Sequence, residues 1–195
     1  TEVLVEPGQP RALTYAILRP YVQVLDNMEY NRGLLIDAVA QAIINRRLEE
    51  SARNGASYLY AGVEQDKVSR SADGTFVAIT PLTDDWQSAL TDVRAVIADA
   101  LAEPPSEDEI ARELSQFDIA FVDMVGQERI QAGRQLADNL VNAVDIREAV
   151  AAPETFLAML RGMRDRFTPE AILEHSRALF EGNVIRAMYL TPEFG

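Results

Sequence analysis

The residues best suited to chemistry lie where a helical pattern gives way to an aromatic strand, in the stretch IINRRLEESARNGASYLY at residues 43–60. Charge this dense is typical of a binding site, a buried ion network or a solvated surface. In the structural interpretation, Arg46 and Arg47 pair with nearby acids such as Glu49 and Glu50, or extend over the helix end. Cations near a helix C-terminus also complement the helix dipole.

A functional interpretation of the same stretch concerns its second half. Here Arg53, together with Tyr58 or Tyr60 on the following strand, points into a cavity and holds a carbonyl or carboxylate group of a peptide. Both residue types suit this task because they donate hydrogen bonds from side chains that can hold a fixed position along a main chain. The sequence leaves both interpretations open.

Elsewhere, the sequence contains few residues suited to a metal-binding site or to nucleophilic catalysis. A helical zinc site needs two imidazoles one turn apart, but the only histidine is His175, and there is no cysteine. We expect His175 to be a partly exposed helical residue, and we expect neither a metal site nor a catalytic residue in this chain. The acidic groups at 84–85 and 107–109 are interpreted as helix starts, although an all-carboxylate cation site stays open.

Composition narrows the classes of partner. The 195 residues carry 31 acidic against 18 basic side chains, a net charge of −13, which disfavours nucleic acid and anionic membranes. No apolar run approaches the roughly 20 residues that span a bilayer, so we expect no membrane insertion. The chain, 48% hydrophobic, is long enough for one well-packed domain, 1–195, and its ends suggest excision from a longer polypeptide.

Hydrophobic spacing predicts the elements that must position these residues. An α+β fold is expected, in which a mostly antiparallel sheet packs against several helices. The expected strands are 11–19, 58–63, 75–80 and 184–190, and the expected first helix is 29–53. Further helices are expected from Thr83, with Asp84 and Asp85 in its acidic first turn, and from Ser106, Pro153 and Thr168. One more is expected through Ile130 to Val144 after a bend or break at Gly126.

Several segments, in order along nearly the whole chain, resemble the insulysin–pitrilysin family of zinc peptidases, which includes the mitochondrial processing peptidases. The segments that carry the resemblance are NRGLLIDAV at 31–39, AIINRRLE at 42–49, AITP at 78–81, PSEDEI at 105–110 and VIRAMYLTP at 184–192. The resemblance implies the family's α/β sandwich, one of several homologous domains that form two halves around an enclosed chamber.

The resemblance also implies that catalysis belongs to a different domain of the parent enzyme. The family's active domain carries His-x-x-Glu-His on its first long helix, whereas residues 34–42 read LLIDAVAQA here. The chain therefore resembles a non-catalytic domain, most closely the second domain of a long bacterial two-half enzyme, with a C-terminal-half domain as second choice. Zinc would belong to the parent enzyme's catalytic domain. The implied partners are other domains of the same polypeptide and a peptide substrate, and the implied compartment is the periplasm.

The family's C-terminal half supplies an Arg and a Tyr to the active site of the other half. By resemblance, Arg53 and Tyr58 occupy a comparable place and Tyr60 is a rival, whereas in a second domain the pair would be structural. Two other functions stay open. One is a stand-alone α+β protein-interaction module without peptidase context, and the other is a processing-peptidase-like scaffold subunit.

Overall fold

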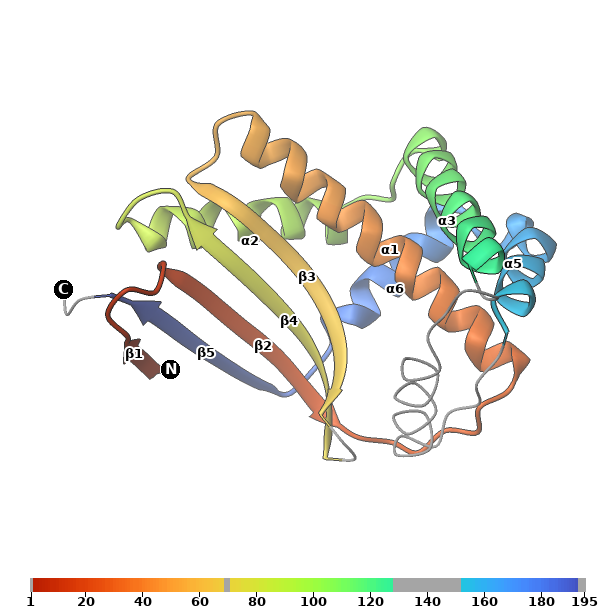
Figure 1. Cartoon of the computed structure of the whole chain (residues 1–195), viewed down its shortest axis with the longest axis horizontal. Helices are drawn as coiled ribbons and strands as arrows, with labels where there is room; N and C mark the ends of the chain where they lie inside the picture. The colour runs from red at the N-terminus through yellow and green to blue at the C-terminus, as the bar shows by residue number, and fades with distance from the viewer. Residues whose placement is uncertain (1, 69–70, 128–151, 193–195) are drawn as a thin grey trace.

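The computed structural model describes residues 2–68, 71–127 and 152–192. Its elements follow one another as in Figure 1: β1 (Glu2–Val5), β2 (Ala12–Pro20), α1 (Met28–Arg53), β3 (Tyr58–Val68), β4 (Ala72–Pro81), α2 (Trp86–Ala102), α3 (Glu107–Gln127), α5 (Pro153–Gly162), a short 3-10 turn η2 (Arg164–Arg166), α6 (Pro169–Leu179) and β5 (Val184–Thr191).

The five strands form one sheet in the order β1-β5-β2-β4-β3. Only the β1–β5 pair is parallel, so the predicted α+β fold with a mostly antiparallel sheet is confirmed. The sequence did not predict β1, because four residues are too few to show a period. The β3–β4 hairpin is longer than predicted, because its polar outer residues, Glu64 to Lys67, pair across to β4 although they carry no apolar alternation.

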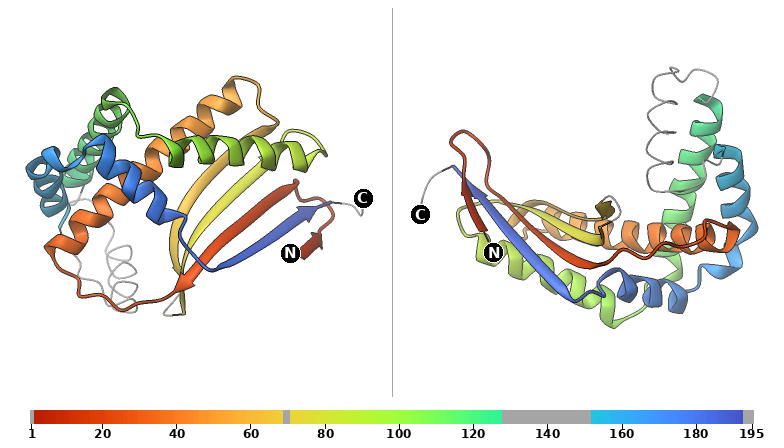
Figure 2. Two further views of the ribbon diagram at one scale, coloured as in Figure 1. Left: turned by 180° about the vertical axis from the view of Figure 1, so that it is seen from behind. Right: turned by 90° about the horizontal axis from the view of Figure 1, so that it is seen from below.

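The helices cover one face of this sheet. Alternate residues Leu13, Tyr15 and Ile17 of β2 face them, together with Val77 and Ile79 of β4. Figures 1 and 2 show the strands as one curved layer, with α3 and α5 side by side beyond it. The strands β5 and β1 lie at the side of the sheet away from α1.

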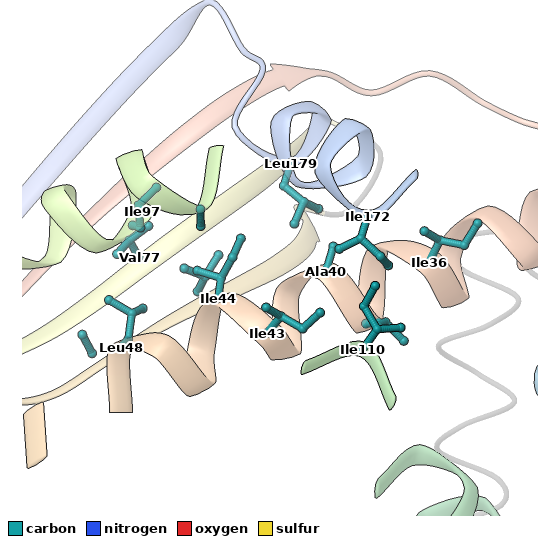
Figure 3. Close-up of a cluster of buried hydrophobic side chains, with 14 of the residues drawn as sticks. Ile36, Ala40, Ile43, Ile44, Leu48, Val77, Ile97, Ile110, Ile172 and Leu179 are labelled. Carbon is teal, nitrogen blue, oxygen red and sulfur yellow. The ribbon is translucent and has the colours of Figure 1, made fainter. Parts of the chain in front are cut away.

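The core is centred on α1, whose apolar residues recur every three or four positions. Figure 3 shows these side chains meeting others from α6, α2, α3 and β4: Ile36, Ala40, Ile43, Ile44 and Leu48 of α1 against Ile172, Leu179, Ile97, Ile110 and Val77. At 2–3 kcal/mol or so for each fully buried large side chain, this cluster dominates the stability of the fold.

The cap predicted at Thr168 is confirmed, whereas the helix predicted from Thr83 begins later, at Trp86, with Asp85 as its N-cap. The side chains of Asp85 and Thr168 accept hydrogen bonds from the main-chain nitrogens of Ser88 and Ala171, at 3.1 and 3.2 Å. Gly126, where a bend or break is predicted, lies within α3, whose description ends one residue later at Gln127. The helix predicted from Ile130 to Val144 lies outside the described residues.

Candidate functional site

The two arginines of the charged junction reach across to α3 and do not pair with the glutamates that follow them. The Arg47 guanidinium donates two parallel hydrogen bonds to Glu109, at 2.7 and 3.1 Å, and Arg46 makes the same forked contact with Glu113. The prediction that Arg46 and Arg47 pair with Glu49 and Glu50 was wrong. Glu49 pairs instead with Arg53, one turn later on α1, and Glu50 pairs with Arg112 on α3. Arg46 and Arg47 contact the less exposed carboxylates of α3.

This ion network holds α1 to the start of α3. Glu113 is only 4% exposed, so its charge depends on Arg46 for compensation. Glu109 also closes the predicted capping box, since its carboxylate accepts from the main chain of Ser106 at 2.8 Å. The hydrogen bonds from Arg47 lower the pKa of Glu109 from 4.5 to about 2. Arg46 and Arg47 therefore join two helices, as the ion-network interpretation of the stretch requires.

Asn45, which precedes the two arginines, ties the same helix to the sheet. Its side-chain amide donates to the carbonyl of Val63 at 3.0 Å and accepts from the main-chain nitrogen of Val63 at 2.7 Å. Val63 lies on β3, the outermost strand of this side of the sheet, and its side chain is buried. The amide thus forms the hydrogen bonds that the outward-facing N–H and C=O of Val63 could otherwise make with a further strand.

The three predicted peptide-contacting residues lie in different surroundings. Arg53 is exposed and pairs with Glu49 one turn earlier, at 3.2 Å. Tyr58 is only 2% exposed, and its hydroxyl donates to the carbonyl of Leu48 at 2.8 Å. Tyr60 is 60% exposed on the opposite face of the sheet from the helices. The structure does not bring the three side chains together around one cavity, and their contact with a peptide stays a prediction.

His175 is partly exposed on α6, as predicted, and its Nδ1 lies 2.7 Å from Asp37 on α1. This hydrogen bond raises the pKa of the imidazole above 6.5. Asp37 belongs to the stretch in which the resemblance would place a zinc motif. In residues 2–68, 71–127 and 152–192, no group of three or more His, Cys, Asp or Glu side chains could hold a metal ion.

The sheet face opposite the helices is uncovered by any described element. A row of small and apolar residues crosses four strands in register: Gly62, Ala78, Thr14 and Met188. Tyr60 lies beside this row with its ring over Gly62, where a Cβ atom would come within 2.5 Å of the phenol oxygen. Glycine at position 62 therefore allows the Tyr60 ring to lie flat on the sheet.

A groove of about 450 Å³ opens on the helical face, between α2 and the strands β2 and β5. The strand β2 supplies Leu13, Tyr15 and Ile17 to its floor, and α2 supplies Leu90, Arg94 and Leu101 to its wall. The sequence did not single out this groove, because Tyr15 and Arg94 are 79 positions apart. The only local sign of the groove is that Arg94, a cation, stands between Leu90 and Ala98 at a spacing of four residues, on a side of the helix that is otherwise apolar.

Among the described residues, no helix is both long enough and apolar enough to cross a membrane. No protein-family model matches the sequence, and no curated protein matches it. Similarity is found with solved structures, and it extends over almost the whole chain.

The first half of the periplasmic protease PqqL from Escherichia coli superposes with a TM-score of 0.84 at 15% identity, over 98% of this chain and 42% of that one. Pitrilysin superposes with a TM-score of 0.65 at 14% identity, over 98% of this chain and 20% of pitrilysin. An inactive peptidase M16 domain from Pseudomonas fluorescens superposes with a TM-score of 0.60 at 12% identity, over 99% of this chain and 43% of that one. The chain thus spans less than half the length of each. The resemblance to the insulysin–pitrilysin family is confirmed as a likeness of fold.

Proposed function

We propose that this chain is a non-catalytic domain of a zinc-dependent metalloendopeptidase. It forms part of the chamber that holds the peptide, while a separate domain carries the zinc and hydrolyses the peptide bond. The observation that carries the proposal is the superposition of 98% of this chain on 42% of the first half of PqqL. A match of this extent supports one domain of a half-enzyme, 1–195, rather than a complete peptidase.

The donor set of this chain does not fit a catalytic zinc ion. Such an ion takes three protein ligands, commonly including two histidines, and leaves one position for water. The helix α1 offers Asp37 without any histidine, and the single imidazole of the chain, His175, already shares its Nδ1 with Asp37. No catalytic step is therefore assigned to residues of this chain.

The uncovered sheet face is the surface that we assign to the other domains of the parent polypeptide and to the peptide. Met188 and Tyr60 expose 41% and 60% of their surface there, and aromatic and methionine side chains are enriched in protein interfaces. Tyr60 is the best placed of the three predicted contacts. Tyr58, engaged with Leu48, has the structural role that a second-domain position implies.

The edges of the sheet differ in their capacity to bind an extended peptide. Strand addition requires unpaired main-chain groups along an edge. At Val63 the outer edge of β3 is closed by Asn45, so a peptide could not pair there without displacing that amide. The outer edge of β1 faces no strand among the described residues, and we assign main-chain pairing with a peptide to this edge.

PqqL is a periplasmic protease, which supports the same compartment for the parent of this chain. The coding sequence upstream of Thr1 should encode a His-x-x-Glu-His helix within one open reading frame. A start codon directly before Thr1 would favour the stand-alone interaction module, and a catalytic subunit encoded separately would favour the scaffold subunit.

The biochemical test uses the purified chain with and without the zinc-bearing domain. Alone, after dialysis, it should contain no stoichiometric zinc by metal analysis and should cleave no fluorogenic peptide. Adding it to the separately purified zinc-bearing domain should raise the rate of peptide cleavage by that domain. Tight zinc binding with turnover by the chain alone would contradict the proposal, and so would an unchanged rate in the mixture.

A further inference from the structure

The groove beside α2 combines an apolar lining with two polar groups. Nine of its eleven lining side chains are apolar, and its volume of about 450 Å³ lies within the range of small-molecule sites. It stays open because Ala98 of α2 and Ala187 of β5 are too small to fill the space between the helix and the sheet. On β5 the groove is bordered by Ile185, which is exposed.

The two polar lining groups are Arg94 and Tyr15, and neither has a hydrogen-bond or ion-pair partner within the described part of the chain. Arg94 stands on α2 with Leu90, Thr91, Ile97 and Ala98 one turn away on either side, so its helix offers it no acid. With no acidic partner among the described residues, the exposed guanidinium of Arg94 is available to an anionic ligand.

Tyr15 adds a neutral donor to the same groove. Burial raises the pKa of its phenol to about 12, against the opposing effect of the Arg94 charge, so the hydroxyl keeps its proton near neutral pH. A guanidinium and a protonated phenol can both donate to one carboxylate. The rest of the lining offers only hydrocarbon surface.

We propose that this groove binds a medium-chain fatty acid, with the carboxylate held by Arg94 and Tyr15 and the hydrocarbon chain lying over Ile17, Ile97 and Leu101. The charge complementarity and the apolar lining carry this inference. It does not depend on the proposed peptidase parent, because it concerns a different face of the sheet from the one assigned to the other domains.

A hydrocarbon chain fits this groove better than a peptide does. Every residue of a peptide brings a main-chain donor and acceptor that require partners when buried. The floor strand β2 is paired on both sides, with β4 and with β5, and the main chain of α2 is engaged in its own helix. Beyond Arg94 and Tyr15 the groove has no side chain that could satisfy a buried peptide group.

The test uses the fluorescence of Trp86, the only tryptophan of the chain. Its ring lies 5.5 Å from that of Tyr189, and Leu90, one turn further along α2, lines the groove. We therefore expect a bound ligand to change the emission of Trp86. We expect decanoate, below its micelle concentration, to bind the full chain saturably with a Kd below about 1 mM. Decanol, which lacks the charge, should bind about tenfold or more weakly.

Variants separate the two parts of the site. Arg94→Gln should weaken decanoate about tenfold or more and leave decanol unchanged, because only the charge-assisted hydrogen bond is lost. Ala98→Leu should weaken both ligands by filling the groove. The matched control is Arg112→Gln, which removes an exposed arginine of α3 that does not line the groove and should leave both affinities unchanged. Arg94 and Ala98 are exposed, so neither substitution removes a core contact.

Three results would overturn the proposal. One is the absence of a saturable change up to roughly 1 mM decanoate. Another is equal affinity for decanoate in the wild type and in Arg94→Gln. The third is tighter binding of acetyl-Leu-Leu, a short peptide with a free carboxylate, than of decanoate, which would assign the groove to peptide C-termini instead. Tyr15→Phe provides an independent check, with an expected two- to tenfold loss for decanoate.

Discussion

The side-chain amide of Asn45 pairs with both main-chain groups of Val63, so that a helix residue occupies the position of a neighbouring strand. The contact joins α1 to the outer strand of the sheet and closes that strand at its centre. It explains in part why the junction at residues 43–60 is rich in polar side chains. Three consecutive residues, Asn45, Arg46 and Arg47, each connect α1 to a different point of the fold.

Asn45→Ala should lower the free energy of unfolding by about 1–3 kcal/mol, because it leaves a partly buried donor and acceptor of Val63 without partners. Urea denaturation followed by circular dichroism measures the change. Gln87→Ala, at an exposed position of α2, is the matched control and should change stability by no more than about 0.5 kcal/mol. Equal effects of the two substitutions would contradict the role given to Asn45.

Glu113→Gln should destabilise the fold by about 1–3 kcal/mol, since it leaves Arg46 without its counter-charge in a partly buried place. Replacing both partners, as in Arg46→Met with Glu113→Leu, should cost less than the sum of the two single changes, because no uncompensated charge remains. A double-mutant cycle from denaturation curves measures this coupling. Strict additivity would show that the two side chains do not interact.

Acid should weaken the fold partly through Glu109. Its pKa in the folded protein is about 2, below the value of 4.5 expected for an unfolded chain, so its contribution is present above pH 4.5 and is lost as the pH falls toward 2. Arg47→Gln removes the main cause of the shift. The variant should therefore show a smaller loss of stability between pH 4.5 and 2 than the wild type. Identical slopes in this range would contradict the assignment.

His175 should contribute stability in the opposite direction. Its pKa is raised by Asp37, and Glu174 adds a smaller effect of the same sign, so the contribution is complete below pH 6.5 and is lost as the pH rises through the folded-state pKa. Titration of the imidazole by NMR should give a value above 6.5, and Asp37→Asn should lower it. A pKa that is unchanged in Asp37→Asn would show that the contact between α1 and α6 does not carry the shift.

The three predicted peptide-contacting residues can be separated by substitution in the parent peptidase. Tyr60→Ala, on the exposed face, should raise KM for peptide with little change in stability, and Arg53→Ala should behave likewise if it reaches the peptide. Tyr58→Phe should instead lower stability by about 0.5–1.5 kcal/mol through the lost hydrogen bond to Leu48 and leave KM unchanged. A raised KM for Tyr58→Phe alone would reverse this assignment.

Local patterns in the sequence predicted the class of fold and most of its helices and strands. The spacing of Leu35, Val39 and Ile43 specified α1, and the Ser106–Glu109 box specified the start of α3, because helix periodicity and capping act within a few residues. The same local signals carried the resemblance to the peptidase family. They gave no information about β1 or the polar outer part of the hairpin, which depend on pairing partners distant in the chain.

The tertiary structure was needed to show which groups the charged residues contact. Arg46 and Arg47 are 67 and 62 positions from their partners, and nearer glutamates offered an equally plausible pairing. The groove between Tyr15 and Arg94 and the closure of Val63 by Asn45 likewise arise where separate segments meet. The physical reason is that an ion pair or a cavity depends on distance in space, which folding sets through the packing of the core and not through neighbouring positions in the sequence.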